Sequence, residues 1–308
     1  MKNRIFHIHA LTATHAGTGQ GIGLIDLPIA RERSTYLPII PGSGLKGVLR
    51  EELRPDGEDK AIWQTLFGPE NNHAEENPFA GALTVGDALL LCFPVRSVKG
   101  TFAWVTSPWI LHRYRRDWQL LGESMSIPSV ETNRIKVTPQ SKLTHEGHVC
   151  LEDLDLSVAS DDDPDIKDLS DRIAREVFPD DPEWSTLFKE RFALVDDETF
   201  DFLIENATEV RARIRIDEKT RTVAKGALWY EENLPAESIL WGLMACSRSR
   251  KPEQAISSGK ELLRIFEQQL FADGECRLQL GGKATVGRGQ ARFILNGGQS
   301  NAANPQSK

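Results

Sequence analysis

A strict alternation of side chains over residues 210–216 restricts the fold more than any other feature of this sequence. Apolar residues and arginines take turns along Val210-Arg-Ala-Arg-Ile-Arg-Ile216. Successive side chains of a strand point to opposite faces, so this run predicts a strand with one apolar face. The other face is basic and carries Arg211, Arg213 and Arg215. Residues 217–220 have turn composition and residues 221–235 return, which predicts a hairpin over about residues 208–235.

The pattern leaves two interpretations of this hairpin open. A basic hairpin commonly lies along a phosphate backbone, and the nearby Trp229 and Tyr230 are residue types that stack on bases. Arginines on an edge hairpin also prevent aggregation without binding any ligand. The acids Glu231 and Glu232 follow directly, either as part of a site or as exposed acids with no role.

Residues 15–33 combine a glycine-rich loop with a short basic segment. The loop begins near His15 and carries one carboxylate, Asp26, and the basic segment carries Arg31 and Arg33. Aspartates in such loops commonly accept backbone hydrogen bonds in a turn. The pattern alone therefore favours a structural role for Asp26.

A helix is predicted to start at Ser43. Its apolar positions recur at helical spacing and should face the core: Leu45, Val48, Leu49 and Leu53. Lys46 and Arg50 lie one turn apart on the opposite face, which we expect to be solvated. Free amides at a helix start together with two cations make a phosphate site. An ordinary capped helix with solubilising charges is the alternative.

Composition and charge exclude several classes of protein. With 40% hydrophobic and 27% charged residues, the 308-residue chain has the balance of a globular protein, and no run is long enough to cross a bilayer. The four cysteines lack the spacing of zinc sites and disulfide frameworks, so we expect reduced thiols and a cytoplasmic protein. The net charge of −8 is local, because residues 152–183 carry −10 and the remainder +2. This acidic segment has the composition of a solvated surface insertion, and a phosphate-binding face elsewhere is allowed.

The two ends of the chain carry further strand and loop signals. Residues 4–14 alternate and predict a half-exposed first strand, with His7 and His9 on one face. Near the other end, residues 281–289 form a glycine-rich loop with Lys283 and Arg288, which lacks the spacing of a Walker A motif. A helix over residues 257–271 and strands at 276–280 and 291–295 surround this loop, and we expect residues 296–308 to be a disordered tail.

Taken in order, these segments resemble the RAMP (repeat-associated mysterious protein) superfamily. The resemblance rests on the Asp26 loop, residues 40–47, 102–106, 215–217, 226–228 and 231–235, and the loop at 281–289. It covers nearly the whole chain, with the acidic segment as its least family-like part. Within the superfamily the chain is most similar to the repeated backbone subunit of type III-B CRISPR effectors, the fourth subunit of the Cmr complex. The Csm-complex counterpart is next.

The resemblance implies an α+β fold, namely a modified RRM or ferredoxin-like palm with a β-hairpin thumb and inserted lid segments. It implies a single domain over residues 1–295. It also implies that copies of the chain stack as a filament along a CRISPR RNA, together with other type III-B effector subunits and without a membrane. Each thumb would displace one nucleotide of the guide–target duplex, and the target RNA would be cleaved beside it with a divalent cation, Mg²⁺ or Mn²⁺.

The resemblance also implies roles for individual residues. Asp26 matches the cleavage aspartate and is the expected weak metal ligand. His15, at the base of its loop, is a candidate general acid or base, or it only packs the loop. Tyr230, Glu231 and Glu232 match a region that supports catalysis, without indicating which glutamate matters. The residues expected to contact RNA are Arg31, Arg33, Ser43, Lys46, Arg50, Arg211, Arg213, Arg215, Lys283 and Arg288.

The chemistry of RNA cleavage agrees with this assignment. RNA carries its own nucleophile, the 2′-hydroxyl, and an enzyme aligns it with the phosphorus by holding an unstacked nucleotide. A carboxylate then holds a divalent ion or takes the hydroxyl proton, and nearby cations offset charge on the phosphate. Two functions compete with this one: a purely architectural guide-binding subunit, and an unrelated metal-dependent hydrolase that acts alone.

Overall fold

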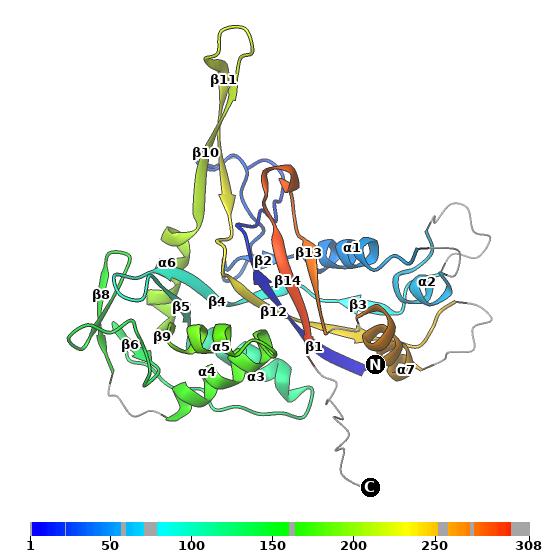
Figure 1. The fold of residues 1–308 in the computed structure, drawn as a ribbon, viewed down its shortest axis with the longest axis horizontal. Helices are drawn as coiled ribbons and strands as arrows, with labels where there is room; N and C mark the ends of the chain where they lie inside the picture. Colours follow the sequence, from blue (N-terminus) through cyan, green and yellow to red (C-terminus); the bar gives the residue numbers. More distant parts are fainter. Residues whose placement is uncertain are drawn as a thin grey trace.

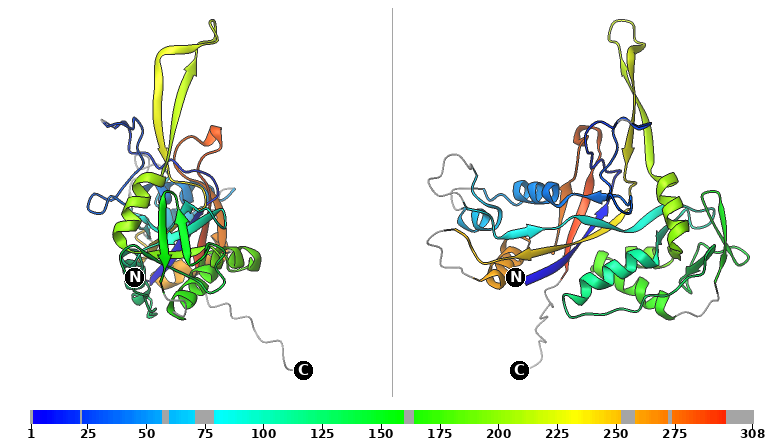
Figure 2. Two further views of the ribbon diagram at one scale, coloured as in Figure 1. Left: turned by 90° about the vertical axis from the view of Figure 1, so that its left-hand side faces the viewer. Right: turned by 180° about the vertical axis from the view of Figure 1, so that it is seen from behind.

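In a computed structural model of the chain, a long two-stranded hairpin projects from a body built on one large mixed sheet (Figures 1 and 2). The structure describes residues 2–21, 23–56, 60–70, 79–159, 164–251, 258–271 and 274–296. Residues 160–163 of the acidic segment and residues 297–308 of the expected tail lie outside this range. In the described ranges, no helix has the length and apolar character needed to span a membrane.

Strands dominate the chain, and helices lie between them. The strands are β1 (Lys2–Ala10), β2 (Ile39–Ile40), β3 (Leu83–Val85), β4 (Ala88–Arg96), β5 (Phe102–Thr106), β6 (Arg134–Val137), β7 (His148–Leu151), β8 (Leu154–Val158), β9 (Phe192–Val195), β10 (Glu209–Ile216), β11 (Val223–Asn233), β12 (Ile239–Cys246), β13 (Glu275–Gln279) and β14 (Gln290–Asn296). The helices are α1 (Gly42–Glu52), α2 (Ala61–Phe67), α3 (Pro108–Gln119), α4 (Pro164–Val177), α5 (Pro182–Lys189), α6 (Asp197–Ala207) and α7 (Gly259–Ile265), with a π turn at Phe266–Leu270 and a 3₁₀ turn at Ala284–Val286.

Four strands and two helices form the centre of the body. The strands lie in the order β14–β1–β12–β4, and each neighbouring pair is antiparallel. Along the chain, α1 lies between β1 and β4, and α7 lies between β12 and β14. This βαββαβ arrangement has the fourth strand beside the first and the third beside the second, as in ferredoxin-like folds. The expected α+β palm is therefore confirmed.

Six further strands of the described chain extend this palm at its two edges. β13 borders β14 at one edge, and β5, β9, β6, β8 and β7 continue the sheet beyond β4. Two of these added pairs, β5 with β9 and β6 with β8, are parallel, so the sheet is mixed.

The first strand is more deeply buried than its pattern predicts. On one face, Phe6 stacks on Phe293, which in turn contacts Phe271 beyond α7. On the other face, Nε2 of His7 lies 2.8 Å from the Tyr114 hydroxyl of α3, and the His9 ring contacts Phe178. Helices thus cover both faces of β1, so the expectation of two histidines on a half-exposed strand is wrong.

Two other segments depart from their expected character. The central strand β12 was not predicted from the sequence, because its run of apolar residues lacks the alternation of a half-buried strand. The acidic segment is more than a solvated insertion. Its helix α4 buries an apolar face against β1 and β14, with Ile166, Leu169, Ile173 and Val177 in the core.

Residues of the expected hairpin form β10 and β11, which pair from Glu209↔Asn233 to Ile216↔Val223. The hairpin rises from the body beside α6 (Figure 1). Along it, both faces are largely solvent-exposed, and its apolar side chains have about half of their surface exposed: Val210, Ile214, Ile216, Val223, Leu228 and Tyr230. The apolar face of this hairpin is therefore not part of the core of the described chain.

The start of α1 is fixed by a side chain from the sheet. Asp87, which interrupts the apolar run before β4, accepts a hydrogen bond of 2.7 Å from the backbone nitrogen of Gly42 at the first helical position. Gly42 is also packed too closely against the Val85–Gly86 backbone for a Cβ atom. The helix that follows the candidate site loop is thereby held against β3 and β4.

Replacement of this capping carboxylate should therefore destabilise the palm. We expect Asp87→Ala to lower the free energy of unfolding by about 1–2 kcal/mol, because a helix-end amide loses its partner. Asp87→Asn, which keeps an acceptor oxygen, should lose less. Urea titration of the purified variants measures both values, and an alanine variant as stable as the wild type would contradict this account of α1.

Candidate active site

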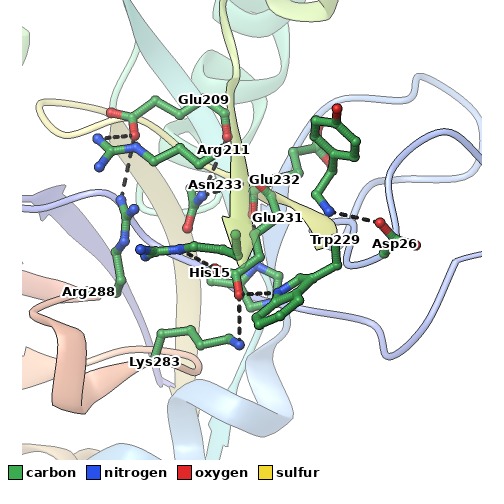
Figure 3. A network of polar contacts seen from close by, with 12 residues as sticks. His15, Asp26, Glu209, Arg211, Trp229, Glu231, Glu232, Asn233, Lys283 and Arg288 are labelled. Atoms are coloured by element: carbon green, nitrogen blue, oxygen red, sulfur yellow. Dashed lines mark hydrogen bonds and ion pairs between the residues drawn. The ribbon is translucent and has the colours of Figure 1, made fainter. Parts of the chain in front are cut away.

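Three segments that are far apart in sequence meet at the base of the hairpin (Figure 3). They are the loop between β1 and β2, the lower part of β11, and the loop between β13 and β14. Isolated backbone bridges join them, with Leu27 beside Glu231 and His15 beside Gly282. Backbone pairing therefore brings the other four residues expected to support catalysis close to Asp26.

Asp26 lies at the exposed surface of this junction. Its Oδ2 atom accepts a hydrogen bond of 2.8 Å from the backbone nitrogen of Tyr230, which directs the carboxylate to the hairpin. The next residue, Leu27, donates its amide to the carbonyl of Tyr230, and its own carbonyl accepts from the amide of Glu232. The Asp26 loop is therefore paired with β11 by backbone hydrogen bonds, as a short extra strand would be.

Glu232 anchors this loop from below. Its side chain is almost fully buried, and its two oxygens accept hydrogen bonds from the Arg31 guanidinium and, at 3.0 Å, from the backbone nitrogen of Ile29. Arg31 also donates to the carbonyl of Tyr36 and lies over the Tyr36 ring. Arg31 thus serves the fold of the loop in this structure, in addition to its expected role toward RNA.

Glu231 serves the opposite side of β11. Its carboxylate is buried and receives Nζ of Lys283 at 2.9 Å, Nε1 of Trp229 at 2.8 Å and Nε of Arg213 at 3.3 Å. Burial alone would raise the pKa of Glu231, but these hydrogen bonds and the charge of Lys283 outweigh it and lower the pKa to about 2. At neutral pH, Glu231 is ionised and both of its oxygens are hydrogen-bonded. Its role in this structure is to hold its three partners in place.

His15 supports the junction. Its ring is 7% exposed, and Nδ1 lies 2.7 Å from the carbonyl of Glu232. Its own carbonyl accepts the amide of Gly282, and Gly281 is packed so closely on that carbonyl that a Cβ atom would not fit. The histidine therefore ties the glycine-rich loop to β11.

A second layer of ion pairs surrounds the hairpin base. Glu209, at the start of β10, binds Arg211 at 2.7 Å and Arg288 at 3.5 Å. With Arg213 on Glu231, two of the three arginines on the basic face are held by acids of the hairpin itself. Glu209 was not among the expected site residues, because a single acid before a basic strand carries no distinctive pattern.

The residues of α1 form a separate group. Ser43 is exposed, whereas Lys46 and Arg50 are half-buried and donate to the carbonyls of Leu83 and Pro69. Burial and the nearby charge of Arg50 lower the pKa of Lys46. The first amide of the helix is taken by Asp87, so the expectation of free amides beside two fully solvated cations is wrong in these details.

Two of the expected RNA contacts are on open surface. Arg33, in the loop before β2, and Arg215, near the far end of β10, are both exposed. In the described part of the chain, neither has an acidic partner comparable to that of Arg31 or Arg213.

A hollow of about 480 Å³ opens between these segments. Asp26, Leu27, Leu228, Trp229 and Lys283 contribute to its walls. Trp229 was recognised only as one of two adjacent aromatics, and its place in this hollow follows from its hydrogen bond to Glu231.

Near Asp26, the protein supplies few ligands for a metal ion. Among the residues that the structure describes, no three His, Cys, Asp or Glu side chains are grouped to hold one. Asp26 is an exposed carboxylate with Oδ2 on a backbone amide, whereas Glu231 is enclosed by its own partners. The donor set fits an ion that takes one ligand from Asp26 and most ligands from a bound substrate.

Fold and site together define the class of this protein. An RRM-like palm, a projecting hairpin and a glycine-rich loop after the last helix are combined, and the RAMP superfamily matches residues 7–292. The chain belongs to the RAMP superfamily.

Two individual relatives show which members of the superfamily this chain is similar to. The chain is 36% identical over 300 residues to the CRISPR system Cmr endoribonuclease Cmr4 of Pyrococcus furiosus, with 96% of each chain covered. It is 23% identical over 313 residues to the CMR subunit Cmr4 of Saccharolobus solfataricus, with 92% and 93% covered.

Solved structures of related proteins have a similar fold. The crystal structure of oligomeric Cmr4 from P. furiosus matches with a TM-score of 0.72 at 29% identity, covering 96% of this chain and 98% of that one. A cryo-EM structure of the type III-B Cmr-beta complex bound to cognate target RNA matches with a TM-score of 0.70 at 20% identity, covering 96% and 97%, which is a likeness of fold alone.

The ionised state of Glu231 should be visible in stability. Because its pKa lies below the ordinary 4.5, its contribution is fully present above pH 4.5 and declines as the pH falls toward 2. The shift corresponds to about 3 kcal/mol at neutral pH. We expect Glu231→Gln to lose up to this amount at pH 7 and progressively less as the pH is lowered.

Urea unfolding of both proteins across this pH range measures the difference. Glu190→Gln, which removes a charge from another ion pair far from the hairpin, is the matched control. A difference between wild type and Glu231→Gln that stayed constant from pH 7 to pH 3 would show that the glutamate charge is not responsible.

Proposed function

We propose that this chain is the repeated backbone subunit of a type III-B CRISPR ribonucleoprotein, which binds CRISPR RNA and cleaves complementary target RNA. The observation that carries this proposal is the position of Asp26. This exposed carboxylate lies on a loop that is hydrogen-bonded to the base of a projecting hairpin. Beside it is a hollow whose wall includes the cation of Lys283. The 36% identity to an endoribonuclease over nearly the full length supports the same activity.

The assembly is part of the proposal. The related P. furiosus protein forms oligomers, and a related complex binds target RNA. Copies of this chain stack along the guide RNA together with other effector subunits, and the hairpin of each copy interrupts the guide–target duplex at a regular interval. The complex works in the cytoplasm, which agrees with four free cysteines in the described chain.

The chemistry uses the 2′-hydroxyl of the target as nucleophile. The hairpin holds one nucleotide out of the duplex, so that its 2′-oxygen lines up with the adjacent phosphorus. Asp26 orients this hydroxyl and accepts its proton as the 2′-oxygen bonds to the phosphorus, while the cations near Asp26 offset the charge that develops on the phosphate. The bond between the phosphorus and the 5′-oxygen breaks, and that oxygen takes up a proton from water and leaves as a 5′-hydroxyl, so the upstream strand ends in a 2′,3′-cyclic phosphate. His15 and Glu232 keep the loop in place and do not touch the RNA in this scheme.

A divalent cation, Mg²⁺ or Mn²⁺, is part of the proposed site. Asp26 would hold it by one carboxylate oxygen, together with phosphate and water oxygens. When bound, such an ion supplies a Lewis acid at the phosphate. Because the described part of the chain groups so few ligands, such an ion would be held mainly by oxygens of the RNA and water.

A purely architectural subunit with the same fold would have no need of an exposed acid at this position. Asp26 therefore favours the catalytic alternative, and its replacement is the experiment that separates the two.

We expect Asp26→Ala to slow cleavage of a guide-matched target RNA by about a hundredfold or more, the usual contribution of a positioned acid or base. Guide binding and assembly should persist, because within the described residues the Asp26 side chain is fixed by a single surface hydrogen bond, to the backbone of Tyr230. Single-turnover cleavage by the reconstituted complex measures the rate, and gel filtration with guide RNA measures assembly.

Asp26→Asn is the control that keeps an acceptor oxygen for the Tyr230 amide. It should assemble normally and still fail to cleave. Loss of assembly together with cleavage in both variants would identify a structural aspartate, and an active Asn variant would remove the proposed role in proton transfer.

A further inference from the structure

Another cavity, of about 280 Å³, lies outside the candidate active site. It is enclosed by the loop that precedes β2, the start of α3 and the first turns of α6. Its volume is just below the range of about 300–1,000 Å³ of pockets that hold drug-sized molecules, so it has room for a group of a few heavy atoms. Among the described residues, none that we expect to support catalysis or to contact RNA lines it.

The entrance of this cavity is acidic. Asp197 and Asp201 of α6 are exposed and line it, and no lysine or arginine of the described chain does. Oδ1 of Asp197 accepts a hydrogen bond of 2.9 Å from the backbone nitrogen of Trp109, and a carboxylate has lone pairs for further donors. Partial burial and the neighbouring charges of Asp197 and Glu205 raise the pKa of Asp201. Carboxylates in this setting gain from a cation placed between them.

Trp109 adds an aromatic face to these acids. It is the second residue of α3, and half of its surface is exposed. Within the part of the chain that the structure describes, its ring contacts no other aromatic ring and no cation, whereas the ring of Trp63 contacts Phe67 and lies under Arg50. The face of an indole attracts a cation placed over it, and more strongly than other aromatic rings do.

Ser107 gives a separate indication of a ligand. It lines the cavity just before α3 and is only 2% exposed. It occupies the N-cap position, yet its hydroxyl caps no helix amide and has no other hydrogen-bond partner among the described residues. Buried polar side chains nearly always have a partner. This hydroxyl therefore indicates a polar group of a bound molecule, independently of the acids and the indole.

The lining fits one class of ligand better than others. Two carboxylates repel a phosphate, so this cavity does not extend the RNA-binding face. A divalent metal ion takes about six oxygen ligands, and the described ranges group no three suitable side chains. Leu37 and Phe200, both buried, form an apolar wall that suits a carbon chain.

We propose that this cavity binds a small organic cation, with its primary ammonium or guanidinium head between the indole of Trp109 and the carboxylates of Asp197 and Asp201. The head donates a hydrogen bond to the hydroxyl of Ser107, and its carbon chain lies on the apolar wall. Free polyamines carry such a head, and so do lysine and arginine side chains of a partner protein. No step of RNA cleavage uses this cavity, so the inference goes beyond the proposed function.

The test is isothermal titration calorimetry of the full-length chain with spermidine and, separately, with Nα-acetyl-argininamide. Salt at about 0.15 M screens the general attraction of cations to an acidic protein. We expect one saturable site per chain. Tighter binding of spermidine identifies a free polyamine as the ligand, and tighter binding of the argininamide identifies a side chain of a partner protein.

Two substitutions in the cavity should weaken this binding. We expect Asp201→Asn to weaken it about tenfold, because a charged acceptor is lost. Trp109→Leu should weaken it about threefold to fivefold, the range of an exposed cation–π contact. Thermal unfolding of each variant reveals any loss of fold.

Matched controls lie on the same helix. Glu198→Gln removes an exposed acid from the first turn of α6, and Phe202→Leu removes an aromatic side chain that is 49% exposed. Neither residue lines the cavity. Both variants should bind each probe as the wild type does.

Three results would overturn the site. The first is the absence of saturable binding of both probes. The second is equal weakening by Asp201→Asn and Glu198→Gln, which would show attraction to acidic surface in general. The third is wild-type affinity in both Asp201→Asn and Trp109→Leu. None of them bears on the proposed function, because the titration contains no guide or target RNA, whereas failure of that function would appear as a wild-type complex that does not cleave.

Discussion

The junction depends on two adjacent buried carboxylates on one strand. Successive side chains of β11 point to opposite faces, so Glu231 and Glu232 serve different partners although they are neighbours in sequence. Glu232 binds Arg31 and holds the Asp26 loop, and Glu231 binds Lys283 and holds the glycine-rich loop. Buried carboxylates are costly unless they are paired and hydrogen-bonded, and each of these has at least two partners. The strand thereby joins two loops that are far apart in sequence, one between β1 and β2 and one between β13 and β14.

This arrangement explains how a projecting hairpin and a rigid site coexist. Above the junction, the hairpin is exposed on both faces and touches little of the body (Figure 2). At its base, backbone bridges and ion pairs fix three segments against β11. In a hairpin that enters a nucleic acid duplex, the reactive groups would thus lie at the base, where the three segments are fixed. The apolar face above the base would stay exposed.

Much of the architecture could be predicted from sequence. The alternation at residues 210–216 identified β10, and the Pro-Gly-Ser run identified the start of α1. The sequence pattern failed to predict strands that are buried on both faces, because such strands lack the alternation of apolar and polar residues. β12 is apolar at nearly every position, and the face of β1 that carries His7 and His9 is covered by segments distant in sequence. The partners of Lys46 and Arg50 are backbone carbonyls, and no pattern reports these. For the same reason, adjacency alone could not separate the roles of Glu231 and Glu232.

We infer that the buried pair of Arg31 and Glu232 holds the Asp26 loop in the position that cleavage requires. A double-mutant cycle in the reconstituted complex, with Arg31→Met, Glu232→Gln and both together, measures it through the single-turnover cleavage rate at constant guide and target binding. We expect each single variant to slow cleavage about tenfold or more and the double variant to be no slower than the worse single one, because both break the same contact. Strictly additive losses, or wild-type rates in either single variant, would contradict it.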